Sequence, residues 1–167
     1  MRLFISINVP EELHRYCRQL QNQFPDMKNT NEFHLTVQFL GDDTENPDQL
    51  IETLKTVQFA PFEIEMGDAV PFPHPAHPRG VWINCKITPK LEKLAEEIRK
   101  TTEKLGYISD KPFKAHITLG RYKRPPNYKP KQVKGEPHQF TVDQFHLVES
   151  ILSSEGPKHK ILASFKA

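Results

Sequence analysis

The stretches FHLTVQFLG (33–41) and AHITLGR (115–121) decide the fold of this 167-residue chain. Each is a run of branched and aromatic residues typical of a β-strand, and each contains the pattern His-x-Thr. The segments around them also correspond. A strand at 2–9, a helix and then FHLTVQFLG are echoed by a strand at 81–88, a helix and then AHITLGR, at offsets of 78 to 82 residues. This order of elements predicts an internal repeat.

The periodicity of the apolar residues predicts the remaining elements. Helices are expected at about 10–24, 47–55 and 89–105, and further strands at 62–70, 139–148 and 159–166. The proline-dense segment 71–80 is expected to be a loop. We predict an α+β fold with two pseudo-symmetric lobes, each a mainly antiparallel sheet backed by helices. Neither half has enough apolar residues for a core of its own, so residues 1–167 should form one domain of two intertwined lobes.

Composition excludes several classes of site. No two of the 7 glycines lie within twelve residues of each other, so the glycine-rich loops that cradle phosphates are absent. Cys17 and Cys85 are too far apart in sequence for a zinc-binding pair, and they favour a reducing, cytoplasmic location. His74 and His77 have a spacing that occurs in metal sites, but no third ligand lies nearby, so we expect no metal. Neither a secretion signal nor a membrane-spanning run is found.

The paired His-x-Thr pattern carries the chemistry. On a strand, residues i and i+2 point to one face, so His34 shares a face with Thr36, and His116 shares a face with Thr118. If the lobes are related by a pseudo-two-fold axis, both faces line one cleft. Two imidazoles can then act as acid and base in a displacement at phosphorus near neutral pH. The threonine hydroxyls can donate hydrogen bonds to the phosphate oxygens. One such histidine would more simply be structural, but two at matching places predict a catalytic pair.

At these residues the sequence resembles the 2H phosphoesterase superfamily, named for its paired H-x-T-x motifs. Within it, the sequence is similar to the RNA 2′,3′-cyclic phosphodiesterases once described as 2′-5′ RNA ligases. The similarity extends from RLFISINVPEE at the start to FHLVESILSSEGPKHKIL near the end. Ala115 stands where a proline is common, and His159 replaces an aromatic residue often found after the late Gly-Pro. Both departures lie outside the motif positions.

The resemblance implies a fold, a reaction and roles for the two histidines. It implies two lobes around a V-shaped cleft, and hydrolysis of an RNA-terminal 2′,3′-cyclic phosphate to a 2′-phosphate without metal or cofactor. His34 would donate a proton to the leaving 3′ oxygen, and His116 would accept one from water. We therefore expect a monomeric enzyme that acts on RNA 3′ ends.

Basic residues lie around the second motif. Arg121 matches a basic residue common in the family, and Lys114 lies two positions before His116, so both are candidate phosphate ligands. By strict alternation Arg121 would face away from His116, so its role requires the strand to bend or end at Gly120. From Arg121 to Lys134 the chain has six Lys or Arg and no Asp or Glu. This segment is typical either of a solvated loop or of a surface that binds a polyanion such as RNA.

Several alternatives stay open at the level of sequence. Phe72, Tyr122 and Tyr128 are candidate stacking surfaces for a base, although roles in the core or in anchoring a loop are simpler. Trp82 is expected in the core. The same two histidines could catalyse the reverse reaction, an ATP-independent 2′-5′ ligation, or could belong to a non-catalytic RNA-binding module. Small cyclic nucleotides and ADP-ribose-type cyclic phosphates are further candidate substrates.

Overall fold

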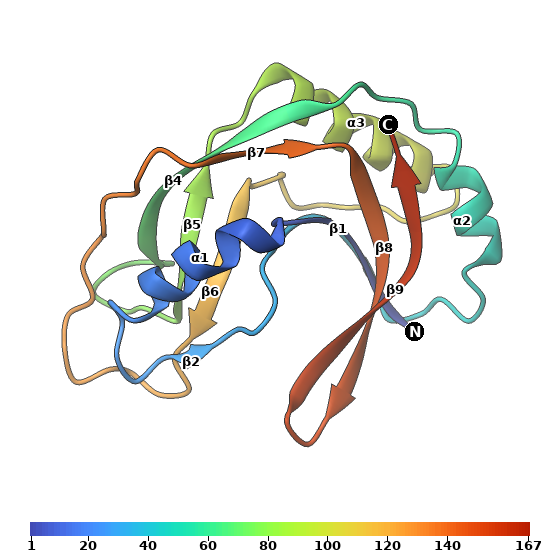
Figure 1. Cartoon of the computed structure of the whole chain (residues 1–167). Coiled ribbons are helices and arrows are strands. Elements are labelled where there is room, and N and C mark those ends of the chain that lie inside the picture. The colour runs from blue at the N-terminus through green and yellow to red at the C-terminus, as the bar shows by residue number, and fades with distance from the viewer.

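A curved antiparallel sheet dominates the computed structural model, which describes residues 1–167 (Figure 1). The strands run in the order β7-β4-β5-β6-β3-β1-β8-β9, with the short β2 beside β6, and every pair is antiparallel. Their bounds are β1 (Arg2–Asn8), β2 (Lys28–Asn29), β3 (His34–Gly41), β4 (Phe62–Phe72), β5 (Gly80–Cys85), β6 (His116–Arg121), β7 (Gln139–Val142), β8 (Gln144–Ser153) and β9 (Gly156–Lys166).

Helices cover one face of this sheet. They are the short 3₁₀ helix η1 (Glu11–Leu13) and the α-helices α1 (His14–Gln21), α2 (Asp48–Leu54) and α3 (Pro89–Glu103). Helix α3 begins where predicted, because the Thr88 side chain accepts the Leu91 backbone N–H at 3.3 Å and Pro89 follows at the first helical position. Helix α1 packs against β6, and α3 packs against β3 and β4. None of the helices combines the length and apolar character needed to cross a membrane.

The two halves of the chain exchange strands. The segment predicted as one strand at 139–148 is interrupted at Asp143, so that β7 pairs with β4 while β8 pairs with β1. In the other direction, β4 follows the first-half elements but pairs with β5 of the second half. The halves meet in the middle of the sheet, where Leu35 of β3 pairs with Ile117 of β6. The predicted α+β fold with a mainly antiparallel sheet is confirmed.

One hydrophobic core lies between the sheet and the helices. The apolar residues between and after the motif positions, Leu35, Ile117 and Leu119, have no exposed surface. Leu20 of α1 and Ile98 of α3 belong to the same core cluster. The opposite face of β3 and β6 therefore carries the His-x-Thr side chains, and it is called the motif face below.

Candidate active site

The two His-x-Thr motifs lie side by side on neighbouring strands. Leu35 pairs with Ile117, and continuing this antiparallel register sets each motif histidine opposite the threonine of the other motif. His34 and His116 are then diagonal neighbours, about 7–8 Å apart by strand geometry. All four motif side chains are half-buried. The structure thus brings the four motif residues together on one face.

An asparagine lies across from each motif histidine on the next strand. Asn8 of β1 pairs with His34, and Asn84 of β5 pairs with His116. Directly opposite residues share a face, so both amide side chains border the motif residues. The offsets of 78 to 82 residues between the two halves would match Asn84 with Ser6 or an earlier residue, whereas the observed register matches it with Asn8. The sequence repeat therefore did not reveal this pair, because an offset in sequence ignores the strand register.

His116 is held by hydrogen bonding and by stacking. Its Nδ1–H donates to the Lys114 carbonyl at 3.1 Å, which leaves Nε2 as the nitrogen available for chemistry. The Trp82 ring lies against the imidazole, with ring centroids 4.1 Å apart. Burial lowers the pKa of His116, and the positive charges of Arg121 and Lys114 act in the same direction, against the hydrogen bond to the carbonyl. Lys114 therefore contacts His116 through its main chain, while its exposed side chain acts at longer range.

A β-bulge turns Arg121 toward the motif face. Thr118 pairs with Trp82 and Gly120 pairs with Val81, so the register skips Leu119. A bulge changes the parity of every later residue, and Arg121, opposite Gly80, thereby returns to the face of Thr118. A phosphate role for Arg121 requires such a bend at this point of the strand.

Buried hydrogen bonds fix the bulge. The Leu119 carbonyl accepts the Thr30 backbone N–H at 3.0 Å and the Gln21 side-chain N–H at 2.9 Å. Gln21 itself is only 5% exposed, and its amide also donates to the Thr30 carbonyl. The Gln21 side chain, at the end of α1, thus holds the end of β6 in its bent direction.

An aromatic stack links Arg121 to His116. The Arg121 guanidinium lies 5.4 Å from the centre of the Phe72 ring, and Phe72 is stacked on Trp82 at 4.2 Å with an interplanar angle of 13°. Phe72 and Trp82 are both half-buried. The prediction that Trp82 belongs to the core was therefore wrong. Its neighbours Val81 and Ile83 point inward, and Trp82 shares the parity of the exposed Asn84.

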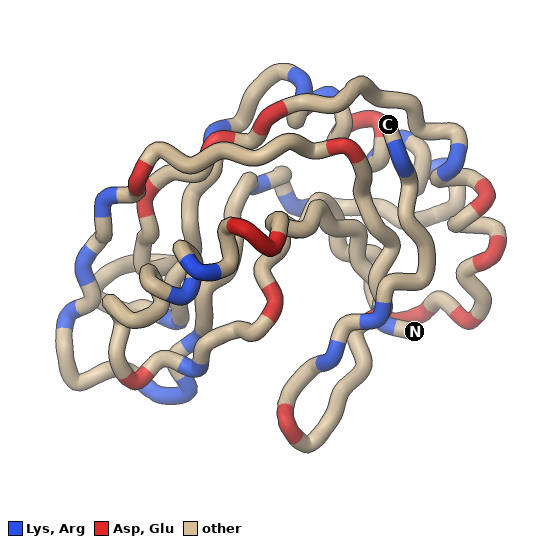
Figure 2. The backbone as a smooth tube through the Cα atoms, viewed as in Figure 1, with Lys and Arg blue, Asp and Glu red and all other residues tan.

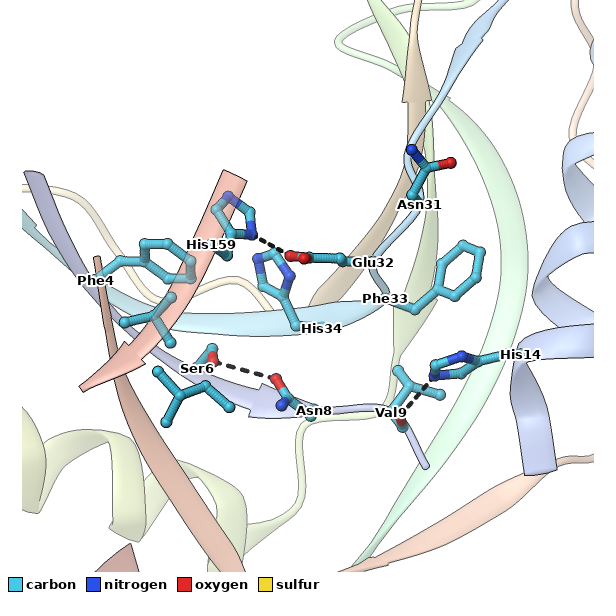
Figure 3. Close-up of a pocket in the computed structure, with 12 residues that line it drawn as sticks. Phe4, Ser6, Asn8, Val9, His14, Asn31, Glu32, Phe33, His34 and His159 are labelled. Carbon is cyan, nitrogen blue, oxygen red and sulfur yellow. Dashed lines mark hydrogen bonds and ion pairs between the residues drawn. The ribbon is translucent and has the colours of Figure 1, made fainter. Parts of the chain in front are cut away.

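His34 lies in a pocket of about 260 Å³, next to aromatic groups and a second histidine (Figure 3). Its ring is stacked on Phe4 at 5.2 Å and meets the edge of the His159 ring at 5.4 Å. Burial, followed by the positive charges of His159 and His116, lowers the pKa of His34 to about 4. Both motif histidines thus lie against an aromatic ring, and they differ because His34 also has a second imidazole, that of His159, beside it.

The basic segment Arg121–Lys134 leaves β6 at the end opposite to His116. Figure 2 shows Lys and Arg positions along the loop at the lower left of the view, where β6 ends beside β2. A second pocket there is lined by Lys28 of β2 together with Lys123 and Arg124. Tyr128 donates to the Pro25 carbonyl at 2.9 Å and is hydrogen-bonded to the buried Tyr122. The two tyrosines anchor this loop.

The remaining candidate ligands lie apart from the motif face. His74 and His77 are exposed in the loop between β4 and β5, and the His74 Nδ1 accepts the Ala76 backbone N–H at 3.0 Å. No group of three or more His, Cys, Asp or Glu side chains is arranged to hold a metal ion. Cys17 and Cys85 are free and buried, and burial raises the pKa of their thiols to about 11 and about 12.

Comparison with known proteins assigns the family. The family model described as the 2′-5′ RNA ligase superfamily matches residues 9–151. The chain belongs to the 2′-5′ RNA ligase superfamily. The resemblance to the 2H phosphoesterases is therefore confirmed, and with it the prediction that the protein is an enzyme.

Similar proteins cover the full length of this superfamily member. The RNA 2′,3′-cyclic phosphodiesterase of Archaeoglobus fulgidus is 33% identical over 176 residues, covering 99% of this chain and all of that protein. The crystal structure of TT0787 of Thermus thermophilus has a TM-score of 0.86 at 32% identity, covering 99% of this chain and 97% of that one. Escherichia coli LigT complexed with 3′-AMP has the same fold, with a TM-score of 0.82 at 24% identity and coverage of 99% and 97%.

Proposed function

We propose that this protein hydrolyses RNA-terminal 2′,3′-cyclic phosphates to 2′-phosphates, with His34 and His116 as the catalytic pair and without a metal or cofactor. The observation that carries the proposal is the pairing of two His-x-Thr motifs across adjacent strands, with both histidines on one face. The relatives named RNA 2′,3′-cyclic phosphodiesterase support the choice of reaction.

In this reaction the enzyme takes one proton from water and gives one proton to the leaving 3′ oxygen. The Nε2 of His116 accepts a proton from water, and the resulting hydroxide oxygen bonds to phosphorus. The bond from phosphorus to the 3′ oxygen breaks, and His34 donates a proton to that oxygen, which leaves the phosphate on the 2′ oxygen. The hydroxyls of Thr36 and Thr118 donate hydrogen bonds to the non-bridging oxygens, where charge increases in the transition state. Arg121 neutralises charge from the side of Phe72.

Substrate binding must change the protonation of the pair. In the free protein His34 has the more strongly lowered pKa, so a single proton shared by the pair resides on His116. The proposed donor role requires that proton on His34. A phosphate anion beside His34 favours its charged form, and a unit charge at about 4 Å contributes about 4 kcal/mol at an effective dielectric constant of about 20. This interaction exceeds the roughly 3 kcal/mol that corresponds to the lowered pKa of His34, so His34 can carry a proton when the phosphate is bound.

The basic segment is proposed to bind RNA upstream of the reacting end. It continues directly from β6, and Lys28 extends it across β2. A single strand of RNA presents one phosphate per nucleotide to such a surface, so binding should weaken as salt increases. We further propose that residues 1–167 form one domain, because each half supplies a strand that pairs with the other half, and that this domain acts as a monomer.

Ligation and hydrolysis use the same histidines, so a direct competition separates them. An oligonucleotide ending in 2′,3′-cyclic phosphate is incubated with the enzyme and an oligonucleotide bearing a 5′-hydroxyl, and the products are followed by gel. Water at about 55 M favours hydrolysis unless the second RNA end is held strongly. We expect the 2′-phosphate product to dominate. A longer 2′-5′-linked product as the main species would show ligation, and tight binding without turnover would show an RNA-binding module.

A further inference from the structure

His34 has a third imidazole beside it. His159 lies on β9, opposite Ser150 of β8, and its ring reaches over Phe4 toward the motif face (Figure 3). The centroid of the His159 ring is 5.0 Å from Phe4 and 5.4 Å from His34, with both contacts edge-on. The imidazole therefore covers one side of His34 from a strand that contains neither motif.

A carboxylate holds this third imidazole in place. The Nδ1 of His159 lies 2.6 Å from Oε2 of Glu32, two residues ahead of His34. Because a carboxylate only accepts hydrogen bonds, the Nδ1 atom must carry the proton. The side chain of His159 is 22% exposed, and that of Glu32 is 53% exposed. This contact thus joins the β8–β9 hairpin to the segment that leads into β3.

The position of His159 opposes a charge on His34 in two ways. The ring removes water from one side of His34, and desolvation disfavours the charged imidazole. A protonated His159 also repels a second positive charge at this distance. Both effects act in the direction of the lowered pKa of His34. The groups that face His34 are His159 on β9, His116 on β6, Glu32 ahead of β3, His14 at the start of α1, and the uncharged Phe4, Ser6 and Asn8 on β1.

We propose that His159, anchored by Glu32, is a positioning residue that keeps His34 uncharged until an anionic phosphate enters the pocket. This inference rests on the proposed function, in which His34 is the proton donor. The cyclic phosphate supplies the negative charge that His34 lacks in the free protein. His34 thereby becomes a competent donor only when a cyclic phosphate is bound, whose leaving 3′ oxygen takes the proton.

Three variants separate the two effects of His159, which are the exclusion of water from His34 by the ring and the repulsion by its charge. His159→Phe keeps an aromatic ring over Phe4 and His34 but removes the charge, His159→Ala removes both, and Glu32→Ala releases the ring from its anchor. A second histidine–glutamate pair, His138 with Glu136 at 3.1 Å, provides the matched control Glu136→Ala. Folding of each variant is checked by the slow reaction of the buried thiols Cys17 and Cys85 with a thiol reagent.

The readout is the NMR titration of the His34 imidazole in the substrate-free protein, together with the acid limb of the pH profile of kcat/KM. We expect His159→Phe to move the His34 titration to higher pH by about one unit, near the lower end of the effect of one nearby charge. His159→Ala should move it further. Glu32→Ala should move it less than His159→Ala does, because release of the His159 ring raises the His34 pKa while loss of the nearby carboxylate lowers it. Glu136→Ala should leave it unchanged. The acid limb should move with it, because kcat/KM reports the free enzyme.

An unchanged titration of His34 in a folded His159→Phe protein would overturn the proposal. So would a drop in kcat without movement of the acid limb, since a purely structural role lowers the height of the profile only. The titration needs no turnover, so it tests the role of His159 even if the reaction proves different. Conversely, if hydrolysis requires both motif histidines but the titration does not move, only the role of His159 fails.

Discussion

Acid should destabilise this protein through His34. The pKa of His34 is about 4 in the folded chain and 6.5 in the unfolded chain. Between these two values the unfolded chain binds a proton that the folded chain does not, so the free energy of unfolding falls as pH decreases from 6.5 to 4. The difference of about 2.5 pKa units corresponds to about 3 kcal/mol. Below pH 4 both states are protonated, and this contribution stops changing.

The assay is urea unfolding of the wild type and of His34→Asn at several values of pH from 8 to 3.5. The wild type should lose about 3 kcal/mol more stability than the variant between pH 7 and pH 4, and the two curves should run parallel above pH 7. His116 and His146 also have lowered pKa values, so they lower the free energy of unfolding of both proteins in the same way as pH decreases. Equal losses in the two proteins would refute the assignment of a buried, neutral His34.

Three further predictions concern the end of β6 and the basic segment that follows it. Gln21→Leu removes the amide that donates to the Leu119 carbonyl, so it should lower the free energy of unfolding by about 1–3 kcal/mol and raise KM by releasing the bulge. Urea unfolding and steady-state kinetics measure both effects, and normal values would show that the bulge needs no support from α1. Arg121→Gln should lower kcat/KM about tenfold for both an oligonucleotide and a mononucleotide cyclic phosphate, because its partner is the reacting phosphate. Replacing four basic loop residues together by Gln should raise KM for the oligonucleotide only and flatten its salt dependence. The four residues are Lys123, Arg124, Lys129 and Lys131. Equal effects of this fourfold change on both substrates would show that the segment is a solvated loop and does not bind RNA.

The motif strands could be predicted because their information is local. Alternation in residues 34–37 and 116–119 separates polar from apolar side chains, and the buried Leu35 and Ile117 follow that alternation. Helix α3 is similarly local, since Thr88, Pro89 and the apolar stripe that follows specify where it starts. These elements could therefore be predicted without knowing which strands or helices they pack against.

The remaining features depend on contacts between distant segments. The parity of Arg121 depends on a bulge that Gln21 holds from another element, and no window of sequence contains both residues. The pairing of His159 with Glu32 joins segments more than a hundred residues apart. Trp82 is different, because its alternation with Asn84 was readable, and the preference of tryptophan for cores outweighed it.

The most direct test of the catalytic pair is product mapping with His34→Ala and His116→Ala. Each variant and the wild type is incubated with an oligonucleotide ending in 2′,3′-cyclic phosphate, with and without EDTA, and the product end is identified as a 2′- or 3′-phosphate. The wild type should yield only the 2′-phosphate at a rate that EDTA does not change. Each variant should be slower by about two or more orders of magnitude with its fold intact. Rapid hydrolysis by both folded variants, or a 3′-phosphate product, would contradict the assignment.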